Sequence, residues 1–86
     1  MNFSKVLTYS EAQWKFVRLP IKIREEEFPE KDKLFDMKFQ EKTYKLKVNN
    51  PGNIMITPLF EKHKFEPGET ITIKTGKNGF EFSVGK

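Results

Sequence analysis

Two versions of one stretch decide the fold of this chain: Leu19-Pro20-Ile21-Lys22-Ile23-Arg24-Glu25-Glu26-Glu27-Phe28 and Ile56-Thr57-Pro58-Leu59-Phe60-Glu61-Lys62-His63-Lys64-Phe65. Each version leads from an apolar residue through a proline into a short charged segment that ends at a phenylalanine. Proline cannot donate a hydrogen bond within a sheet but is tolerated in the first turn of a helix. Each copy therefore predicts a switch from a strand to a short helix.

The spacing of the two copies extends to the segments around them. Phe28 and Phe65 are 37 residues apart (65 − 28 = 37), and the same offset aligns Val17 with Ile54. With one residue skipped at Asp32 the offset becomes 36, and it aligns Phe35, Met37, Tyr44, Leu46 and Val48 with Ile71, Ile73, Phe80, Phe82 and Val84. A repeat of this size predicts two supersecondary units that share one core. Chance similarity between short alternating strands is the alternative.

The size and composition predict a single small domain over residues 1–86. Nine phenylalanines and the lack of cysteine predict a Phe-rich core without disulfides or thiolate metal sites. A formal net charge of +4 slightly favours an anionic partner. No segment approaches the ~18 apolar residues of a membrane span, so we expect an intracellular protein, cytoplasmic or nuclear, that has no membrane partner.

Alternating apolar residues and turn signals indicate seven strands and two helices. The strands are expected at residues 3–8, 15–19, 33–39, 44–48, 54–56, 70–75 and 80–84, and the helices at 21–27 and 58–64. Residues 9–13 are expected to form a polar loop; the alternative is a helical turn capped by Ser10 with Gln13. Asn78-Gly79 predicts a tight hairpin turn before the last strand.

The predicted fold class is mainly β: a small seven-stranded pseudobarrel with two short helices and an internal pseudo-twofold repeat. So many short strands in so short a chain need full or partial closure to hide their edges. We expect Tyr44, Leu46 and Val48 to face the core, and Lys45 and Lys47 to face outward.

Residue patterns typical of catalysis are missing from the sequence. His63 is the only histidine and falls on a charged segment, where we expect it to be solvated. Glu25, Glu26 and Glu27 are consecutive, which spreads them around a helix instead of pairing them. The run from Gly76 to Gly79 is too short for a phosphate loop. We therefore expect no enzyme activity, no cofactor and no metal site.

Polar and basic residues gather at residues 8–15 and 49–53, two loops that the repeat predicts at one end of the barrel. Amides and hydroxyls read base edges, and lysines and arginines neutralise phosphates. The candidate DNA-binding residues are Lys5, Thr8, Ser10, Gln13, Trp14, Lys15, Arg18, Lys45, Lys47, Asn49, Asn50 and Asn53. The alternative is that the amides and hydroxyls only form turns, that the lysines only solubilise a strand, and that Trp14 plugs the barrel end.

A sparse pattern over nearly the whole chain carries a resemblance to a known family. It consists of Phe3-x-Lys5-Val6-Leu7-Thr8-x-Ser10-Glu11, Arg18-Leu19-Pro20, Phe28-Pro29 and Pro67-Gly68-Glu69. This pattern resembles the DNA-binding pseudobarrel of plant B-three transcription factors, a fold that also serves as the recognition domain of some restriction endonucleases. The residues from Leu19 to Glu25 are also similar to the Leu-Pro-x-x-Ile-Arg-Glu signature of AbrB-type swapped-hairpin transcription factors, which are related cradle-loop barrels.

The resemblance implies a non-catalytic module that grips the major groove of double-stranded DNA with two arms, as part of a regulator or restriction system. By position those arms are residues 8–15 and 49–53, with Lys5 and Arg18 at the base of the first. Pseudosymmetric halves imply a monomer, and such a module is often joined to a further domain. Both arms are short, and Glu11 stands where the family has Asp. A protein-interaction or oligomerising barrel without DNA binding is therefore the alternative.

Overall fold

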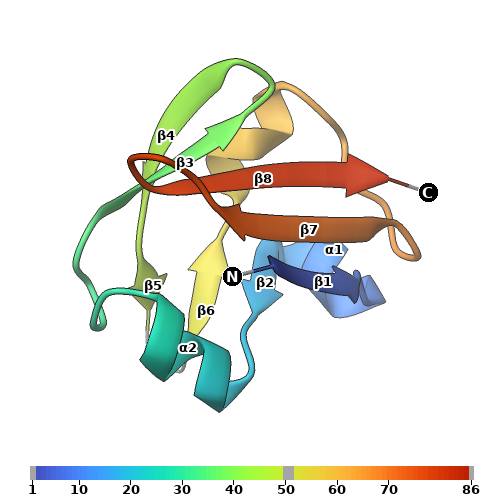
Figure 1. The fold of residues 1–86 in the computed structure, drawn as a ribbon. Coiled ribbons are helices and arrows are strands. Elements are labelled where there is room, and N and C mark those ends of the chain that lie inside the picture. The colour runs from blue at the N-terminus through green and yellow to red at the C-terminus, as the bar shows by residue number, and fades with distance from the viewer. Residues whose placement is uncertain (1, 50–51, 86) are drawn as a thin grey trace.

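Two β-sheets pack across one apolar core in the computed structural model of the protein, which describes residues 2–49 and 52–85 (Figure 1). The larger sheet has the order β1-β7-β8-β3-β4, with β1 at Asn2–Val6, β7 at Thr70–Thr75, β8 at Phe80–Gly85, β3 at Phe35–Phe39 and β4 at Lys42–Leu46. The smaller sheet has the order β2-β6-β5, with β2 at Phe16–Arg18, β6 at Asn53–Met55 and β5 at Val48–Asn49. Neighbouring strands are antiparallel except β3 and β8, which are parallel.

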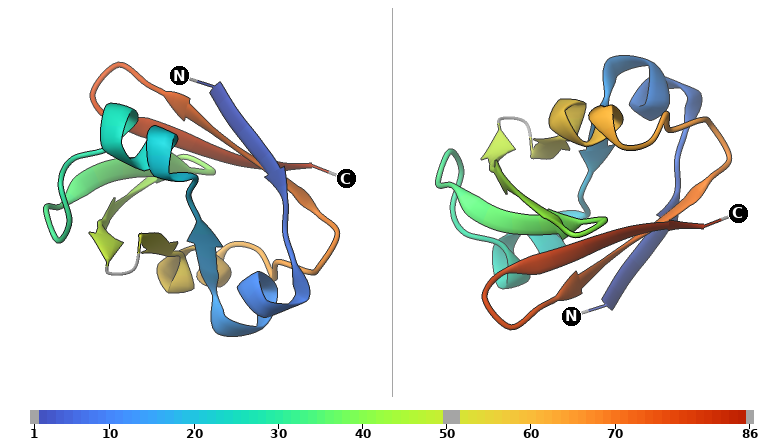
Figure 2. Two further views of the ribbon diagram at one scale, coloured as in Figure 1. Left: turned by 90° about the horizontal axis from the view of Figure 1, so that it is seen from below. Right: turned by 90° about the horizontal axis from the view of Figure 1, so that it is seen from above.

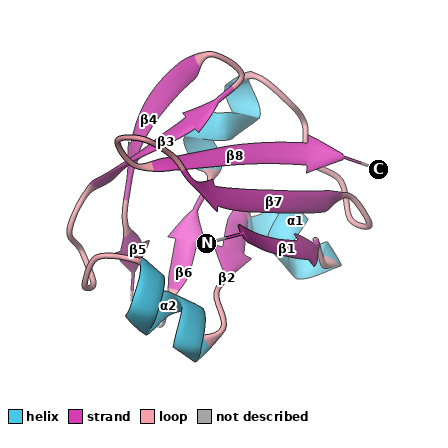
Figure 3. Ribbon diagram, in the orientation of Figure 1, coloured by secondary structure: helices cyan, strands magenta, loops and turns pink. Residues whose placement is uncertain are grey.

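Three short helices lie at the periphery of the strands (Figure 3). They are α1 at Tyr9–Trp14, α2 at Ile21–Glu27 and the 3₁₀-helix η1 at Thr57–Glu61. None of the helices formed by residues 2–49 and 52–85 has the length and apolar character needed to cross a membrane.

The core is filled by the alternating apolar side chains of both sheets. In β3, Phe35, Met37 and Phe39 are buried while the residues between them are not. The rings of Phe28, Phe35 and Phe80 form a cluster in which the centroids of Phe28 and Phe80 lie 4.4 Å apart. Burial of each such ring contributes roughly 1.5–3 kcal/mol. The Phe-rich core predicted from composition is therefore present.

The mainly β class is confirmed, but a seven-stranded pseudobarrel is not. The described residues form eight strands in two sheets that do not close into a barrel. The strand expected at 44–48 divides at Lys47, where the chain leaves β4 in the larger sheet and enters β5 in the smaller one. Tyr44, Leu46 and Val48 are all buried. Because buried and exposed residues continue to alternate through this corner, the sequence pattern predicts one strand where the structure has two.

Two predictions, a loop at residues 9–13 and a helix at residues 58–64, were wrong in part. Residues 9–13 belong to helix α1 instead of a loop, because Thr8 and Glu11 cap its first turn. The helix expected at 58–64 is the shorter η1, which has Pro58 in its first turn and buries Leu59 in the core. Runs of 3₁₀-helix stay short because their hydrogen-bond geometry is poorer than that of an α-helix.

The β7–β8 hairpin also differs from the prediction. Its turn contains the four residues between the paired Thr75 and Phe80, closed by a 2.7 Å hydrogen bond from the Gly76 N–H to the Gly79 carbonyl. Gly79 has φ 153°, and a Cβ there would lie 2.6 Å from the backbone oxygen of Asp36 in β3. The glycine is thus required by the close approach of β8 to β3.

The predicted repeat has a local structural counterpart in the smaller sheet. Val17 in β2 pairs with Ile54 in β6, the residue that the offset of 37 makes its equivalent. A twofold axis between these two residues exchanges the neighbouring pairs of the ladder as well. The symmetry does not extend further: β1 has no counterpart in the second half, and it occupies the free edge of β7.

The β3–β4 turn provides a test of the backbone geometry. Gln40 and Glu41 both have positive φ, at 49° and 69°. Asn-Gly is preferred in such two-residue turns. Replacing Gln40→Asn together with Glu41→Gly should raise the free energy of unfolding, measured by urea denaturation, by about 1 kcal/mol, because asparagine and glycine adopt positive φ at a lower cost. Thr43→Gly inside β4 is the control and should lower it by roughly 0.5–1 kcal/mol. A double variant no more stable than the parent would contradict this turn.

Candidate nucleic-acid interface

One buried carboxylate organises the N-terminal corner of the molecule. The side chain of Glu11 in α1 is the only buried charged one within the described residues, with 2% of the residue exposed. Its Oε2 accepts hydrogen bonds from Lys5 Nζ at 2.6 Å and from the Arg18 backbone N–H at 2.8 Å. Its Oε1 accepts one from the Thr8 backbone N–H at 3.0 Å. The Thr8 hydroxyl accepts in return from the Glu11 N–H at 3.1 Å, which completes a capping box.

The hydrogen bonds decide the charge state of this carboxylate. Burial alone would raise the pKa of Glu11, because it penalises the ionised form. The donors from Arg18, Lys5 and Thr8, together with the positive charge of Lys5, outweigh burial and hold the pKa of Glu11 below its ordinary value of 4.5. Glu11 is therefore ionised at neutral pH.

Glu11 joins the two sheets at a place where no ladder connects them. Lys5 lies in β1, an edge strand of the larger sheet, and Arg18 lies in β2, an edge strand of the smaller one. Lys5 and Thr8, both predicted to contact DNA, are thus engaged in holding α1 between the sheets. The sequence contains the pattern of this capping box as Thr8-x-x-Glu11, two residues before the pair Ser10 and Gln13 that was considered as the cap.

The outer face of the smaller sheet gathers several of the predicted residues. Val17, Ile54 and Val48 point into the core, so the residues that alternate with them point outward. Five side chains share this outward face, which we call the platform: Phe16, Arg18, Asn49, Asn53 and Met55. All five are at least partly exposed. The sequence singled out Arg18, Asn49 and Asn53 but not the apolar pair Phe16 and Met55.

The two predicted arms border the platform but not from one end. The Lys15 carbonyl, after α1, accepts a 2.8 Å hydrogen bond from the Ile56 N–H, whereas the Gly52 carbonyl accepts one of 3.4 Å from the Leu19 N–H. The arms therefore stand at opposite ends of the β2–β6 ladder, because the local twofold axis crosses its middle. A three-residue ladder is only about 10 Å long. Both views of Figure 2 accordingly show α1 and the start of β6 along the same edge of the molecule.

The exposed residues of the first arm are Thr8, Tyr9, Ser10, Gln13, Trp14 and Lys15. Trp14 is 65% exposed and does not plug the sheet end. Lys15 ends α1 in the left-handed conformation, and its Nζ lies 5.3 Å from the centroid of the Phe60 ring. The arm meets the platform where Lys15 precedes Phe16 of β2.

The described residues of the second arm are held by local contacts, one of them with helix α2. Asn49 Oδ1 accepts a hydrogen bond from the Asn53 backbone N–H at 3.2 Å. Gly52 has φ 116°, and a Cβ there would lie 1.9 Å from a guanidinium nitrogen of Arg24. Arg18 and Arg24 line the groove that runs past Gly52 and Asn53. Asn50, also predicted to bind DNA, lies outside the described residues.

Lys45 lies apart from the platform, whereas Lys47 directly precedes Val48 of the smaller sheet. Lys45 is on β4 in the larger sheet, where its ammonium pairs with Asp36. Lys47 follows β4 at the corner between the sheets, and its Nζ is 3.7 Å from Asp32 Oδ1. Both ion pairs are largely exposed, so they contribute little to stability.

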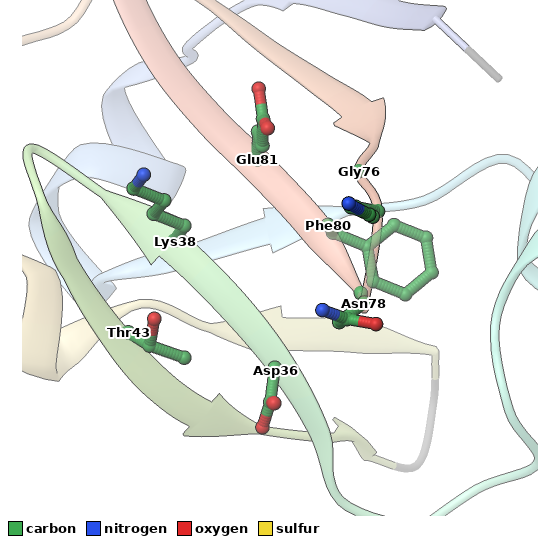
Figure 4. A pocket seen from close by; sticks show the side chains of 9 residues that line it. Asp36, Lys38, Thr43, Gly76, Asn78, Phe80 and Glu81 are labelled. Atoms are coloured by element: carbon green, nitrogen blue, oxygen red, sulfur yellow. The ribbon is translucent and has the colours of Figure 1, made fainter.

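A second hollow lies on the larger sheet beside the β7–β8 turn. Figure 4 shows Asp36 and Lys38 on β3, Thr43 on β4 and Glu81 on β8 around it. Asp36 and Glu81 balance the charges of Lys38 and Lys77 on this hollow, so it has no excess positive charge to attract a phosphate backbone. The platform is therefore the better candidate interface.

No grouping of three or more potential metal ligands occurs within residues 2–49 and 52–85. His63, expected to be solvated, is instead partly buried, with its Nε2 3.0 Å from Glu69 Oε2. The Glu69 carboxylate also accepts a 2.7 Å hydrogen bond from the Glu66 backbone N–H. This pair holds the turn before β7.

No family of known proteins matches this sequence, and no characterised protein is detectably similar to it in sequence. In its fold the chain is similar to the N-terminal domain of Helicobacter pylori LlaJI.R1, with a TM-score of 0.72 and 8% sequence identity. The similarity covers 98% of this chain and 86% of that one. At this identity the likeness establishes a shared fold and says nothing of shared site residues.

The buried carboxylate makes stability depend on pH. Because the folded-state pKa of Glu11 is lowered, its contribution is present above the unfolded-state value near 4.5 and is lost as pH falls through the folded value. Glu11→Gln should lower the free energy of unfolding at pH 7 by about 2–4 kcal/mol, because buried donors lose their anion. Urea denaturation from pH 7 to pH 2 should show this deficit shrinking below pH 4.5.

Glu26→Gln is the matched control, since Glu26 is exposed on α2. This variant should follow the parent protein at every pH within about 0.5 kcal/mol. A deficit for Glu11→Gln that stays constant down to pH 2 would contradict an ionised Glu11.

Proposed function

We propose that this chain is a non-catalytic domain that binds double-stranded DNA through the platform and the two arms beside it. The observation that carries the proposal is the chemistry of the platform. A guanidinium from Arg18 and amides from Asn49 and Asn53 share one open face whose side chains include no carboxylate. Guanidinium groups bind phosphate or guanine edges, and amides pair with adenine edges.

The dimensions of the platform suit the major groove. Three strands about 4.8 Å apart span about 10 Å, and the groove is about 12 Å wide. Helix α1, which ends at Lys15, leads into the Phe16 end of the platform, and the second arm borders the other end. In this arrangement the cations supply affinity along the backbone, and the amides supply sequence preference.

The resemblance to the B-three pseudobarrel supports the same function. The segments that correspond to its DNA-gripping arms, residues 8–15 and 49–53, are the ones that border the platform. The fold likeness to the N-terminal domain of LlaJI.R1 supports the β architecture on which that correspondence depends. A role as the recognition module of a regulator or restriction system follows from the resemblance.

Two charge-removing variants test the proposal. Arg18→Ala should preserve the fold, because only the backbone N–H of Arg18 bonds to Glu11. Lys15→Asn keeps a residue type that tolerates the left-handed backbone at this position. Each should weaken binding to a mixed-sequence duplex and reduce the slope of log affinity against log salt by about 1. Fluorescence titration over a series of salt concentrations measures both effects.

Lys77→Ala is the control, because it removes the same charge at the β7–β8 turn, away from the platform. It should change affinity far less than Arg18→Ala. No binding to any duplex at low salt would overturn the proposal. A mass that increases with protein concentration, without DNA affinity, would support the protein-interaction or oligomerising alternative.

A further inference from the structure

Apolar side chains lie open to solvent at one end of the platform. Phe16 and Met55 face each other across the β2–β6 pair, and Met55 is 40% exposed. Trp14 stands at the end of α1, which the hydrogen bond from the Ile56 N–H to the Lys15 carbonyl fastens to this end of the ladder. This apolar end, defined by Trp14, Phe16 and Met55, has no role in the phosphate and amide contacts described above.

The occupant of the apolar end must combine apolar groups with a dense negative charge. Lys15 and Arg18 lie on either side of Phe16 in sequence, and both side chains are exposed. Arg18 forms no side-chain ion pair with any residue in 2–49 or 52–85. An apolar contact that has one cation beside it, Lys15, and another at the far end of the ladder, Arg18, suits the DNA groove better than the apolar surface of a protein, because the phosphates on both sides of the groove find partners.

The major groove of DNA contains one apolar group that lies between two rows of phosphates. Phosphate and sugar oxygens need hydrogen-bond donors, which Trp14 offers only through its indole N–H and which Phe16 and Met55 lack. The C5-methyl group of thymine is the apolar feature of the major groove, and it is read by apolar side chains. The minor groove presents only acceptors and one donor.

We propose that the apolar end of the platform recognises the 5-methyl groups of thymine. This inference rests on the proposed DNA-binding function and deepens it, because it names a group that the site reads. The platform then has a polar end at Arg18 and Asn53 and a methyl-reading end at Phe16 and Met55. Thymine is preferred over uracil and cytosine at the positions that face the apolar end.

The test compares two duplexes that differ only in these methyl groups. The preferred duplex is first selected from a random pool with the parent protein, and is then synthesised with thymine or with uracil. Burial of one methyl group is worth about 0.8 kcal/mol, so each lost contact should weaken binding about fourfold. Met55→Ala should bind the thymine duplex less tightly and should discriminate less between the two duplexes than the parent does.

Leu34→Ala is the matched control, because Leu34 is 60% exposed in the loop before β3, outside the platform. It should keep the full difference between thymine and uracil. Circular dichroism and urea denaturation establish that each variant is folded. Comparing the two duplexes within each variant cancels any effect of uracil on the duplex itself.

The outcomes separate this inference from the function on which it rests. Equal affinity of the parent protein for both duplexes would overturn the inference while leaving DNA binding intact. A selected site without thymine, or a Met55→Ala variant that keeps the full discrimination, would also overturn it. Failure to bind any duplex would overturn the proposed function itself. Self-association that Met55→Ala abolishes would assign the apolar end to a second copy of the chain.

Discussion

The ionised carboxylate of Glu11 is the interaction on which the rest of the structure depends. The two sheets do not close into a barrel, and the edge strands β1 and β2 are not paired with each other. Glu11 bridges this gap with Lys5 on one side and the Arg18 N–H on the other. Removing a carboxylate from water is costly, and only a full set of donors offsets that cost. The same contacts fix the start of α1 and the backbone of β2.

The platform is held rigidly from several directions as a result. Val17 and Ile54 anchor it from below in the core, with no exposed surface. Glu11 fixes one edge through Arg18, and Arg24 packs closely against Gly52 at the far end. Side chains on a backbone restrained in this way lose little further entropy when they bind. In Arg18, the backbone N–H stabilises the structure by its hydrogen bond to Glu11, while the side chain remains exposed on the surface.

Local patterns predicted the strands better than they predicted their partners. Alternation identified β7 at Thr70–Thr75 and the inward face of β3, because burial on one side of a strand leaves a period of two. Alternation does not record which strand lies alongside. It therefore missed the corner at Lys47, where inward side chains continue while the chain changes sheet. Helix α1 was missed because Ser10 was weighed as its cap and Thr8 was not.

The candidate site was harder to predict because its residues meet only through long-range pairing. The predicted list joined Arg18, Asn49 and Asn53, which do share the platform, to Lys5 and Lys45, which lie on the larger sheet. Spacing along the chain could not separate these two groups. The repeat contained the missing information, since it made Val17 and Ile54 equivalent before their pairing was known. Applied to the strands as a pair, it would have placed Phe16 opposite Met55.

The same repeat gives the platform two chemically different ends. The axis between Val17 and Ile54 exchanges Phe16 with Asn53 and Arg18 with Met55. Each exchange replaces an apolar residue by a polar or charged one, so the backbone is locally symmetric while the surface is not. A duplex has local twofold symmetry of its own, and symmetric proteins bind palindromic sites. A single platform with one cationic and one apolar end lacks that symmetry. Under the proposed DNA-binding function, we therefore expect a non-palindromic site bound in one orientation.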